Sequence, residues 1–74
     1  MLKSYRMIIL LNNWSEVKFE YTNNEDLIEA IRRLVDVISR EELIFTCWSE
    51  KMNRRIYYIP TKNIVSFYTY KSID

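Results

Sequence analysis

The chain has 74 residues, a net charge of +1, one cysteine, and neither histidine nor glycine. A chain of this length is predicted to form a single domain spanning residues 1–74, and its near-zero net charge excludes strong long-range attraction to nucleic acid. One cysteine excludes an internal disulfide, the absence of histidine excludes a Cys/His zinc set, and the absence of glycine excludes the glycine-dependent phosphate loops. We therefore expect neither a metal nor a cofactor.

Residues 3–11 are predicted to form the first strand. They are apolar on both faces, which is typical of a strand in the centre of its sheet. Residues 16–22 alternate between apolar and charged side chains, and a turn at residues 12–15 joins the two segments into a hairpin. Because glycine is absent, we expect asparagine to occupy turn positions that need a positive φ.

Residues 24–38 carry the one strong helix signal in the chain. Apolar residues recur three and four positions apart, and charged residues take the opposite side. Asn23 or Asn24 is expected to cap the first turn, where Glu25 and Asp26 suit the positive end of the helix dipole. The stripe expected to pack against the sheet consists of Leu27, Ile28, Ile31, Leu34, Val35 and Ile38.

Three further strands are predicted at residues 43–50, 55–59 and 64–70, joined by turns at 51–54 and 60–63. The order ββαβββ predicts an α+β fold class. We expect a small antiparallel sheet of about five strands with one amphipathic helix packed on one face, or the same sheet curled into a partial barrel.

The segment IYYIPTKNIVSFYTY, residues 56–70, is similar to the closing hairpin of small Sm-like barrels, in which a strand, a tight turn and an Ile-Val strand follow one another. Those barrels place their helix before all the strands, whereas a hairpin comes first in this chain. No function is carried over from the resemblance.

Turn lengths predict how the last three strands pair. Two-residue turns at 52–53 and 61–62 would place Cys47 opposite Tyr58, Trp48 opposite Tyr57, and Tyr58 opposite Val65. One face would then collect Leu43, Phe45, Cys47, Ile56, Tyr58, Val65 and Phe67, and the other Ile44, Trp48, Tyr57, Ile59, Ile64, Tyr68 and Tyr70. Both faces are apolar, and one helix covers only one of them. The second face is expected to meet another chain, a ligand or the inside of a barrel.

No pattern of residues predicts catalysis. Cys47 lies in the middle of a predicted strand, and the chain has no histidine to activate it, so we expect a small buried side chain. Glu16, Glu20 and Glu50 are expected at exposed strand or turn positions, where the sequence gives no reason for a role as general acid or base. The chain is not expected to be an enzyme.

Aromatic residues gather in the C-terminal half, and basic residues accompany them in the turns. The residues expected to bind a partner are Trp48, Tyr57, Ile59, Tyr68 and Tyr70. The residues that would contact an anion or nucleic acid are Lys51, Arg54, Arg55 and Lys62.

These features favour a small non-enzymatic interaction protein that self-associates and binds a protein target through an aromatic sheet face. Self-association is expected through that face, or through edge-to-edge pairing of residues 64–70 with a copy. Two alternatives stay open: an RNA or single-stranded DNA binding module, and a dimer that traps a small anionic ligand such as a nucleotide.

The longest apolar run near the N-terminus, residues 7–11, is shorter than the roughly 7–15 residues of a signal-peptide core or the roughly 20 of a membrane span. We therefore expect a cytoplasmic protein without membrane contact, and an unpaired cysteine agrees with a reducing compartment. Abundant Ile, Lys, Asn and Tyr indicate an AT-rich genome, such as that of a low-GC bacterium or its phage, and favour an accessory protein or inhibitor.

Overall fold

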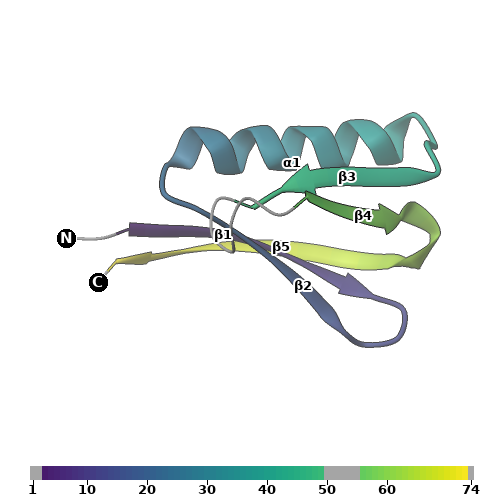
Figure 1. The fold of residues 1–74 in the computed structure, drawn as a ribbon, viewed down its shortest axis with the longest axis horizontal. Helices are drawn as coiled ribbons and strands as arrows, with labels where there is room; N and C mark the ends of the chain where they lie inside the picture. Colours follow the sequence, from purple (N-terminus) through teal and green to yellow (C-terminus); the bar gives the residue numbers. More distant parts are fainter. Residues whose placement is uncertain (1–2, 50–55, 74) are drawn as a thin grey trace.

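The computed structural model describes residues 3–49 and 56–73, and within them it shows one α-helix, one short 3₁₀ helix and five strands (Figure 1). The two ends of the described chain lie side by side, because Lys3 pairs with Ile73. The elements in chain order are β1 (Lys3–Leu11), β2 (Glu16–Tyr21), α1 (Asn24–Ser39), β3 (Ile44–Trp48), β4 (Ile56–Pro60), η1 (Thr61–Asn63) and β5 (Ile64–Ile73).

The strands form two antiparallel sheets. β1 lies between β2 and β5, and β3 pairs with β4. The predicted α+β class is therefore confirmed, as is the central place of β1, where Met7 lies opposite Phe19 on one side and Thr69 on the other. The predicted single sheet is divided in two, and among the described strands no ladder joins the two sheets into a closed barrel.

Helix α1 follows its sequence signals closely. The side chain of Asn23 accepts a hydrogen bond from the backbone N–H of Asp26 at 2.8 Å, which satisfies one of the free donors of the first turn. At the other end, Arg40 pairs with Asp36 at 3.1 Å. Among the described residues, no helix is long and apolar enough to cross a bilayer.

The predicted buried stripe of α1 is partly wrong. The buried positions are Leu27, Ala30 and Leu34, whereas Ile28, Val35 and Ile38 are 44, 48 and 46% exposed. The side chain of Ala30 is small enough to let the helix approach the strands, so the contact line runs through it. Ile28, Val35 and Ile38 lie on the next flank of the helix and stay half exposed to water, whereas Ile31 packs against the core.

The core lies between the three-stranded sheet on one side and α1 with the β3–β4 hairpin on the other. Phe19 stands at its centre, with edge-to-face contacts to Phe45 and Tyr57 at ring distances of 6.3 and 5.2 Å. The buried cluster comprises Met7, Ile9, Phe19, Tyr21, Leu27, Ala30, Leu34, Phe45, Cys47 and Ile59. The two sheets and the helix thus share one core.

The predicted pairing of β3 with β4 is wrong by one residue. Cys47 lies opposite Tyr57, and Trp48 lies opposite Ile56. Seven residues, 49–55, separate the last pair of this ladder, whereas a two-residue turn requires an even number. A shift of one residue moves every side chain of a strand to the other face, so Tyr57 and Ile59 join the core side and Ile56 and Tyr58 turn outward.

The predicted β4–β5 hairpin is also wrong, and with it the pairing of Tyr58 with Val65. Residues 61–63 form the 3₁₀ turn η1, which leads β5 away from β4 to the open edge of β1, where Ile8 pairs with Tyr68. The backbone N–H of Asn12 donates to the carbonyl of Asn63 at 2.8 Å and holds this turn to the end of β1. β1 thus has a hydrogen-bonded neighbour on each edge, which agrees with its central position in the sheet and with its apolar residues on both faces.

Positive φ values fall on residues other than asparagine in the described part of the chain. They belong to Trp14, at 68°, and Glu41, at 55°. Glu41 closes α1 in the position that glycine usually takes: its N–H donates to the carbonyl of Ile38, and the N–H of Glu42 donates to that of Val37. These bonds end the helix and turn the chain into β3.

Candidate functional site

The outward side of β3 and β4, called here the hairpin face, carries a row of large apolar side chains. Ile44 and Ile56 are 53 and 54% exposed, Trp48 is 38% exposed, and Tyr58 is 69% exposed. They come from both strands, since Trp48 pairs with Ile56 and Thr46 pairs with Tyr58. No element of the described chain lies over this row.

A pocket of about 210 Å³ lies beside the hairpin face, toward α1. Its lining residues are Arg33, Thr46, Cys47, Trp48, Ile56 and Tyr58. The guanidinium of Arg33 lies 3.4 Å from the carbonyl oxygen of Thr46 and 3.5 Å from its hydroxyl, which ties the helix to β3 at the pocket rim. The volume is below the roughly 300 Å³ at which small-molecule sites begin, so it suits one inserted side chain better than a cofactor.

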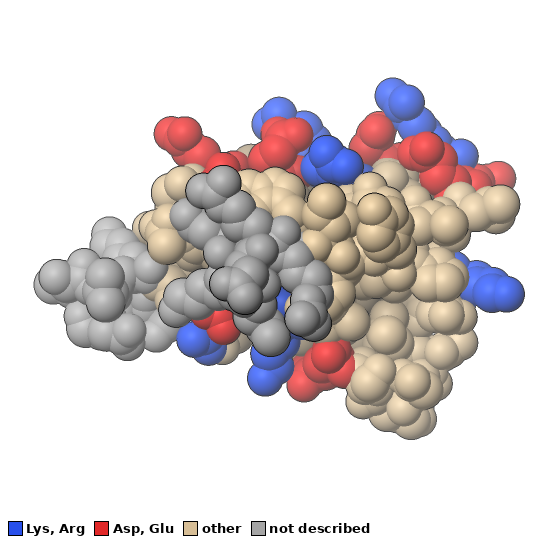
Figure 2. All heavy atoms as spheres, in the orientation of Figure 1, with Lys and Arg blue, Asp and Glu red and all other residues tan. Residues whose placement is uncertain are grey.

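The helix side of the hairpin face is charged. Asp26 and Glu29 line a small pocket with Trp48, and Asp36 and Glu42 line another with Ile44. Arg33 is the single basic residue in the lining of both pockets. In Figure 2 the charged side chains gather along α1, whereas the surface over β4 carries none in this view. Glu29 pairs with Arg32 at 3.5 Å and Asp36 pairs with Arg40 at 3.1 Å, so the hairpin face is an apolar strip whose helix-side rim carries charges of both signs.

The structure places the five predicted partner-binding residues in three different parts of the molecule. Trp48 lies on the hairpin face, as expected. Ile59 is only 5% exposed and belongs to the core, and Tyr57 packs its ring against Phe19. Tyr68 and Tyr70 are exposed on the far side of the three-stranded sheet, next to β1. The five residues do not form one binding face.

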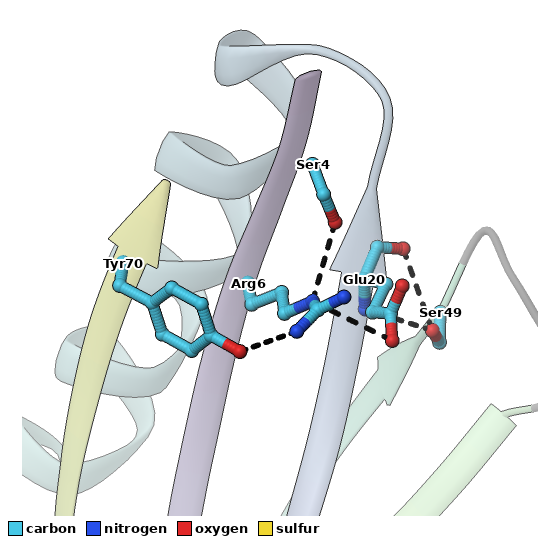
Figure 3. A network of polar contacts seen from close by, with 5 residues as sticks. All are labelled: Ser4, Arg6, Glu20, Ser49 and Tyr70. Carbon is cyan, nitrogen blue, oxygen red and sulfur yellow. Dashed lines mark hydrogen bonds and ion pairs between the residues drawn. The ribbon is translucent and has the colours of Figure 1, made fainter. Parts of the chain in front are cut away.

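Tyr68 and Tyr70 are held by charged neighbours on that far side. Arg6 donates to the hydroxyl of Tyr70, lies 5.4 Å from the centre of its ring, and pairs with Glu20 at 3.6 Å (Figure 3). The hydroxyl of Tyr68 donates to Glu16 at 2.9 Å, and this hydrogen bond raises the Tyr68 pKa. Because the guanidinium of Arg6 lies over the ring of Tyr70 and the hydroxyl of Tyr68 is bonded to a carboxylate, these rings offer little free surface on which nucleic-acid bases could stack.

Of the four predicted anion-binding residues, only Lys62 belongs to the described chain. It lines a pocket with Glu41 and Glu42, whose carboxylates oppose an anion there. Lys51, Arg54 and Arg55, together with Glu50 and the predicted turn at 51–54, lie outside the described residues. The described residues therefore do not assemble a cationic site.

The single cysteine is buried, as the sequence predicts. Its sulfur lies 3.2 Å from the hydroxyl of Tyr21, which also lies 2.7 Å from the carbonyl oxygen of Trp48. Burial raises the pKa of the Cys47 thiol, and burial together with the contact to Cys47 raises the pKa of Tyr21. Both groups stay neutral at physiological pH, which suits a structural role at the end of β3.

Two residues of the hairpin face, Ile56 and Tyr58, are not predicted from the sequence, because a two-residue turn places them on the opposite face. Ile44 lies on the face predicted for it, although it is not among the five expected partner-binding residues. Side chains alternate between the two faces along β3, and Phe45 and Cys47 are the ones that reach the core. This alternation identifies Ile44 and Trp48 as the outward-facing residues.

In comparisons with protein-family models, with curated proteins and with solved structures, no match to this chain was found. The residues of this chain alone therefore indicate what it could do.

Proposed function

We propose that this chain is a non-enzymatic interaction protein that binds a protein target through the hairpin face. The observation that carries the proposal is the row Ile44, Trp48, Ile56 and Tyr58, exposed by 38–69% while alternate residues of the same strands are buried. Water-exposed rows of large apolar side chains on a small domain mark binding surfaces. Trp, Tyr and Arg, all present here, are the residue types that dominate binding energy at protein interfaces.

The side chains of the hairpin face indicate what kind of target it would bind. An apolar side chain of the target fits the pocket beside Trp48. Basic residues of the target fit Asp26 and Glu42 at the rim, since Glu29 and Asp36 already pair with Arg32 and Arg40. Within the described residues, a second copy of this chain would bring the same carboxylates to the same rim. We therefore infer that the target is a different protein, with an apolar anchor flanked by Lys or Arg. This chemistry is compatible with an accessory protein or inhibitor that acts in the cytoplasm.

The experiment compares two aspartate variants at equal exposure. Ile56 and Val65 are 54 and 55% exposed, but only Ile56 lies on the hairpin face. A tagged chain and the variants Ile56→Asp and Val65→Asp are used to isolate a target from cells of the natural source. The target is then purified and titrated by calorimetry. We expect saturable binding by the unchanged chain and by Val65→Asp, and at least about 30-fold weaker binding by Ile56→Asp.

Two results would contradict the proposal. Equal loss of binding in Ile56→Asp and Val65→Asp would place the target elsewhere on the molecule. A purified chain that doubles its mass, and loses that doubling only in Ile56→Asp, would show that the hairpin face holds a second copy instead. Unchanged circular dichroism spectra of both variants serve as the folding control.

The nucleic-acid and anionic-ligand alternatives draw less support from the described residues. Lys62 stands beside two carboxylates, and the guanidinium of Arg6 lies over the ring of Tyr70. A titration with labelled single-stranded RNA and DNA at two salt concentrations tests the first alternative. Binding that weakens steeply with salt would favour it.

A further inference from the structure

The direction of the backbone groups along β1 shows which edge of β5 is open. Leu11 donates to Ser15 on the β2 side, and Asn12 donates to Asn63 on the β5 side, so even-numbered residues of β1 point toward β5. Ile8 pairs with Tyr68 and Arg6 with Tyr70, so the even residues of β5 use their groups on β1. The odd residues Phe67, Thr69 and Lys71 therefore point their N–H and C=O groups away from the sheet.

These groups have no hydrogen-bond partner among the residues that the structure describes. β5 has β1 as its one neighbour in the sheet, and no other described element packs along its outer side. The strand has ten residues, which is long for an edge, and between Ile64 and Tyr70 it carries no charge and no proline. The features that usually protect an edge strand lie only toward its two ends, as a register shift between Ile64 and Ser66 and the charge of Lys71, and the stretch from Phe67 to Tyr70 has none.

The opposite edge of the same sheet is protected. Glu16, Lys18 and Glu20 are the residues of β2 whose backbone groups point outward, and all three carry charges. The hydroxyl of Ser49 accepts a hydrogen bond from the N–H of Glu20 at 3.0 Å and lies 3.4 Å from its carbonyl oxygen (Figure 3). The contrast between the two edges singles out β5 as the one built to receive another strand.

The half-exposed flank of α1 lies on the same side of the molecule as this open edge. Arg33 and Val37 face β3, while Ile28 and Val35 project from the opposite flank of the helix. Ile38 shares a pocket with Ile64 at the start of β5. Figure 3 agrees: α1 passes behind β5, and β3 lies beyond β2. An open strand edge and an apolar helix flank thus form one continuous surface.

We propose that this surface joins two copies of the chain, with β5 of each copy pairing antiparallel across a two-fold axis. Pairing centred on Thr69 places Thr69 opposite its copy, Phe67 opposite Lys71, and Tyr68 opposite Tyr70. This register keeps the outward backbone groups opposite each other, separates the two Lys71 charges, and creates two aromatic cross-strand pairs. The two sheets merge into one of six strands, and the flanks holding Ile28, Val35 and Ile38 meet above the junction.

Such a dimer is a better occupant than an extended peptide of another protein because both features are covered at once. A single added strand would satisfy Phe67, Thr69 and Lys71 but would leave the helix flank in water. A second copy brings a strand and a helix together in the arrangement that the first copy needs. The inference does not depend on the proposed target, since the hairpin face remains open in the dimer.

Light scattering coupled to size exclusion tests the inference. The unchanged chain should have twice the 9.1 kDa of one copy at tens of micromolar. Thr69→Lys places two like charges across the axis and should raise the dimer dissociation constant by about 100-fold or more. Because the Thr69 side chain is exposed, the fold should persist, as circular dichroism would verify. Val35→Glu should weaken the dimer less, and Ile56→Asp should leave it intact.

A cross-link tests the register. In a Cys47→Ala background, Thr69→Cys should form an intermolecular disulfide under mild oxidation, because facing residues lie about 5.5 Å apart between Cα atoms. Ser66→Cys, on the same strand but away from the axis, should not. A monomer at 100 µM, or a dimer that survives Thr69→Lys and is lost in Ile56→Asp, would overturn the inference. A dimer that Thr69→Lys dissociates, but that cross-links through Ser66→Cys, would overturn the register.

Discussion

The two faces of the β3–β4 hairpin share one backbone and have opposite roles. Phe45, Cys47 and Ile59 on the inner face are at most 5% exposed. Ile44 and Ile56 on the outer face are 53 and 54% exposed, although they are just as apolar. The difference arises because α1 and the three-stranded sheet pack mainly against the inner face, and on the outer face the ring of Trp48 contacts that of Tyr21 at 5.5 Å. Hydrophobicity alone does not define the core of this protein; the direction in which each side chain points decides it.

The comparison also separates stability from binding. A buried residue that is truncated leaves a cavity, while an exposed one loses only partial contacts with water-facing neighbours. Substitutions on the inner face should therefore change folding, and substitutions on the outer face should change association with a target. Four experiments test this division.

The largest effect is expected from Phe45→Ala. Phe45 is fully buried and touches the ring of Phe19, so its removal should cost about 3–5 kcal/mol of unfolding free energy. Tyr58→Ala, on the neighbouring strand but facing outward, should change it by no more than about 0.5 kcal/mol. Urea titrations followed by circular dichroism measure both. Similar losses in the two variants would show that the hairpin has no distinct inner and outer face.

That division follows from the strand pairing, which the sequence predicted only in part. Strand positions, the helix and its Asn23 cap could be predicted because they depend on local periodicity and on one side-chain hydrogen bond. The register of β3 with β4 depends on the length of the connection between Trp48 and Ile56, and an error of one residue exchanged Ile59 with Tyr58. Such a length is set by the whole core and not by the turn residues alone.

The burial of Ala30 and the pairing of β5 with β1 escaped prediction for a similar reason. Ala30 is too small to register as an apolar anchor, yet it is 2% exposed because the helix packs most closely there. β5 pairs with a strand more than fifty residues earlier, and its own turn residues, Thr61–Asn63, are equally compatible with a hairpin. Long-range pairing of this kind leaves no local signal in the chain.

The second prediction concerns the point where the hairpin joins the other sheet. Ser49 is 1% exposed, and its hydroxyl accepts a hydrogen bond from the backbone N–H of Glu20 on β2. Ser49→Ala should remove this part-buried hydrogen bond and should cost about 0.5–1.5 kcal/mol. Thermal unfolding measures the loss, and Ser49→Thr, which keeps the hydroxyl, is the comparison variant. If the two substitutions were equally costly, the hydrogen bond would not be the cause.

The third prediction uses pH. Burial raises the pKa values of Cys47 and Tyr21 above those of the unfolded chain, about 8.5 and 10. Groups with raised pKa values contribute stability that is complete below these unfolded values and is lost as the pH rises from them through the folded values. Melting temperatures should therefore be level near pH 7–8 and fall at higher pH. Tyr21→Phe should cost about 1 kcal/mol at neutral pH and should reduce the fall above about pH 10. A fall of the same size in Tyr21→Phe would assign it to other groups.

The smallest effect is expected from Glu41→Gly, which touches neither face of the hairpin. Glu41 closes α1 at φ 55°, where a side chain costs about 1 kcal/mol or more and glycine costs nothing. Part of this gain is offset because glycine is more flexible in the unfolded chain. The net result should be a stabilisation of about 0.5–1 kcal/mol, measured by urea titration. Glu41→Ala, which keeps the steric conflict, should give no such gain. Since the helix cap is remote from Tyr58, target binding should be unchanged in Glu41→Gly, and the variant provides a more stable background in which substitutions of the outer face can be compared.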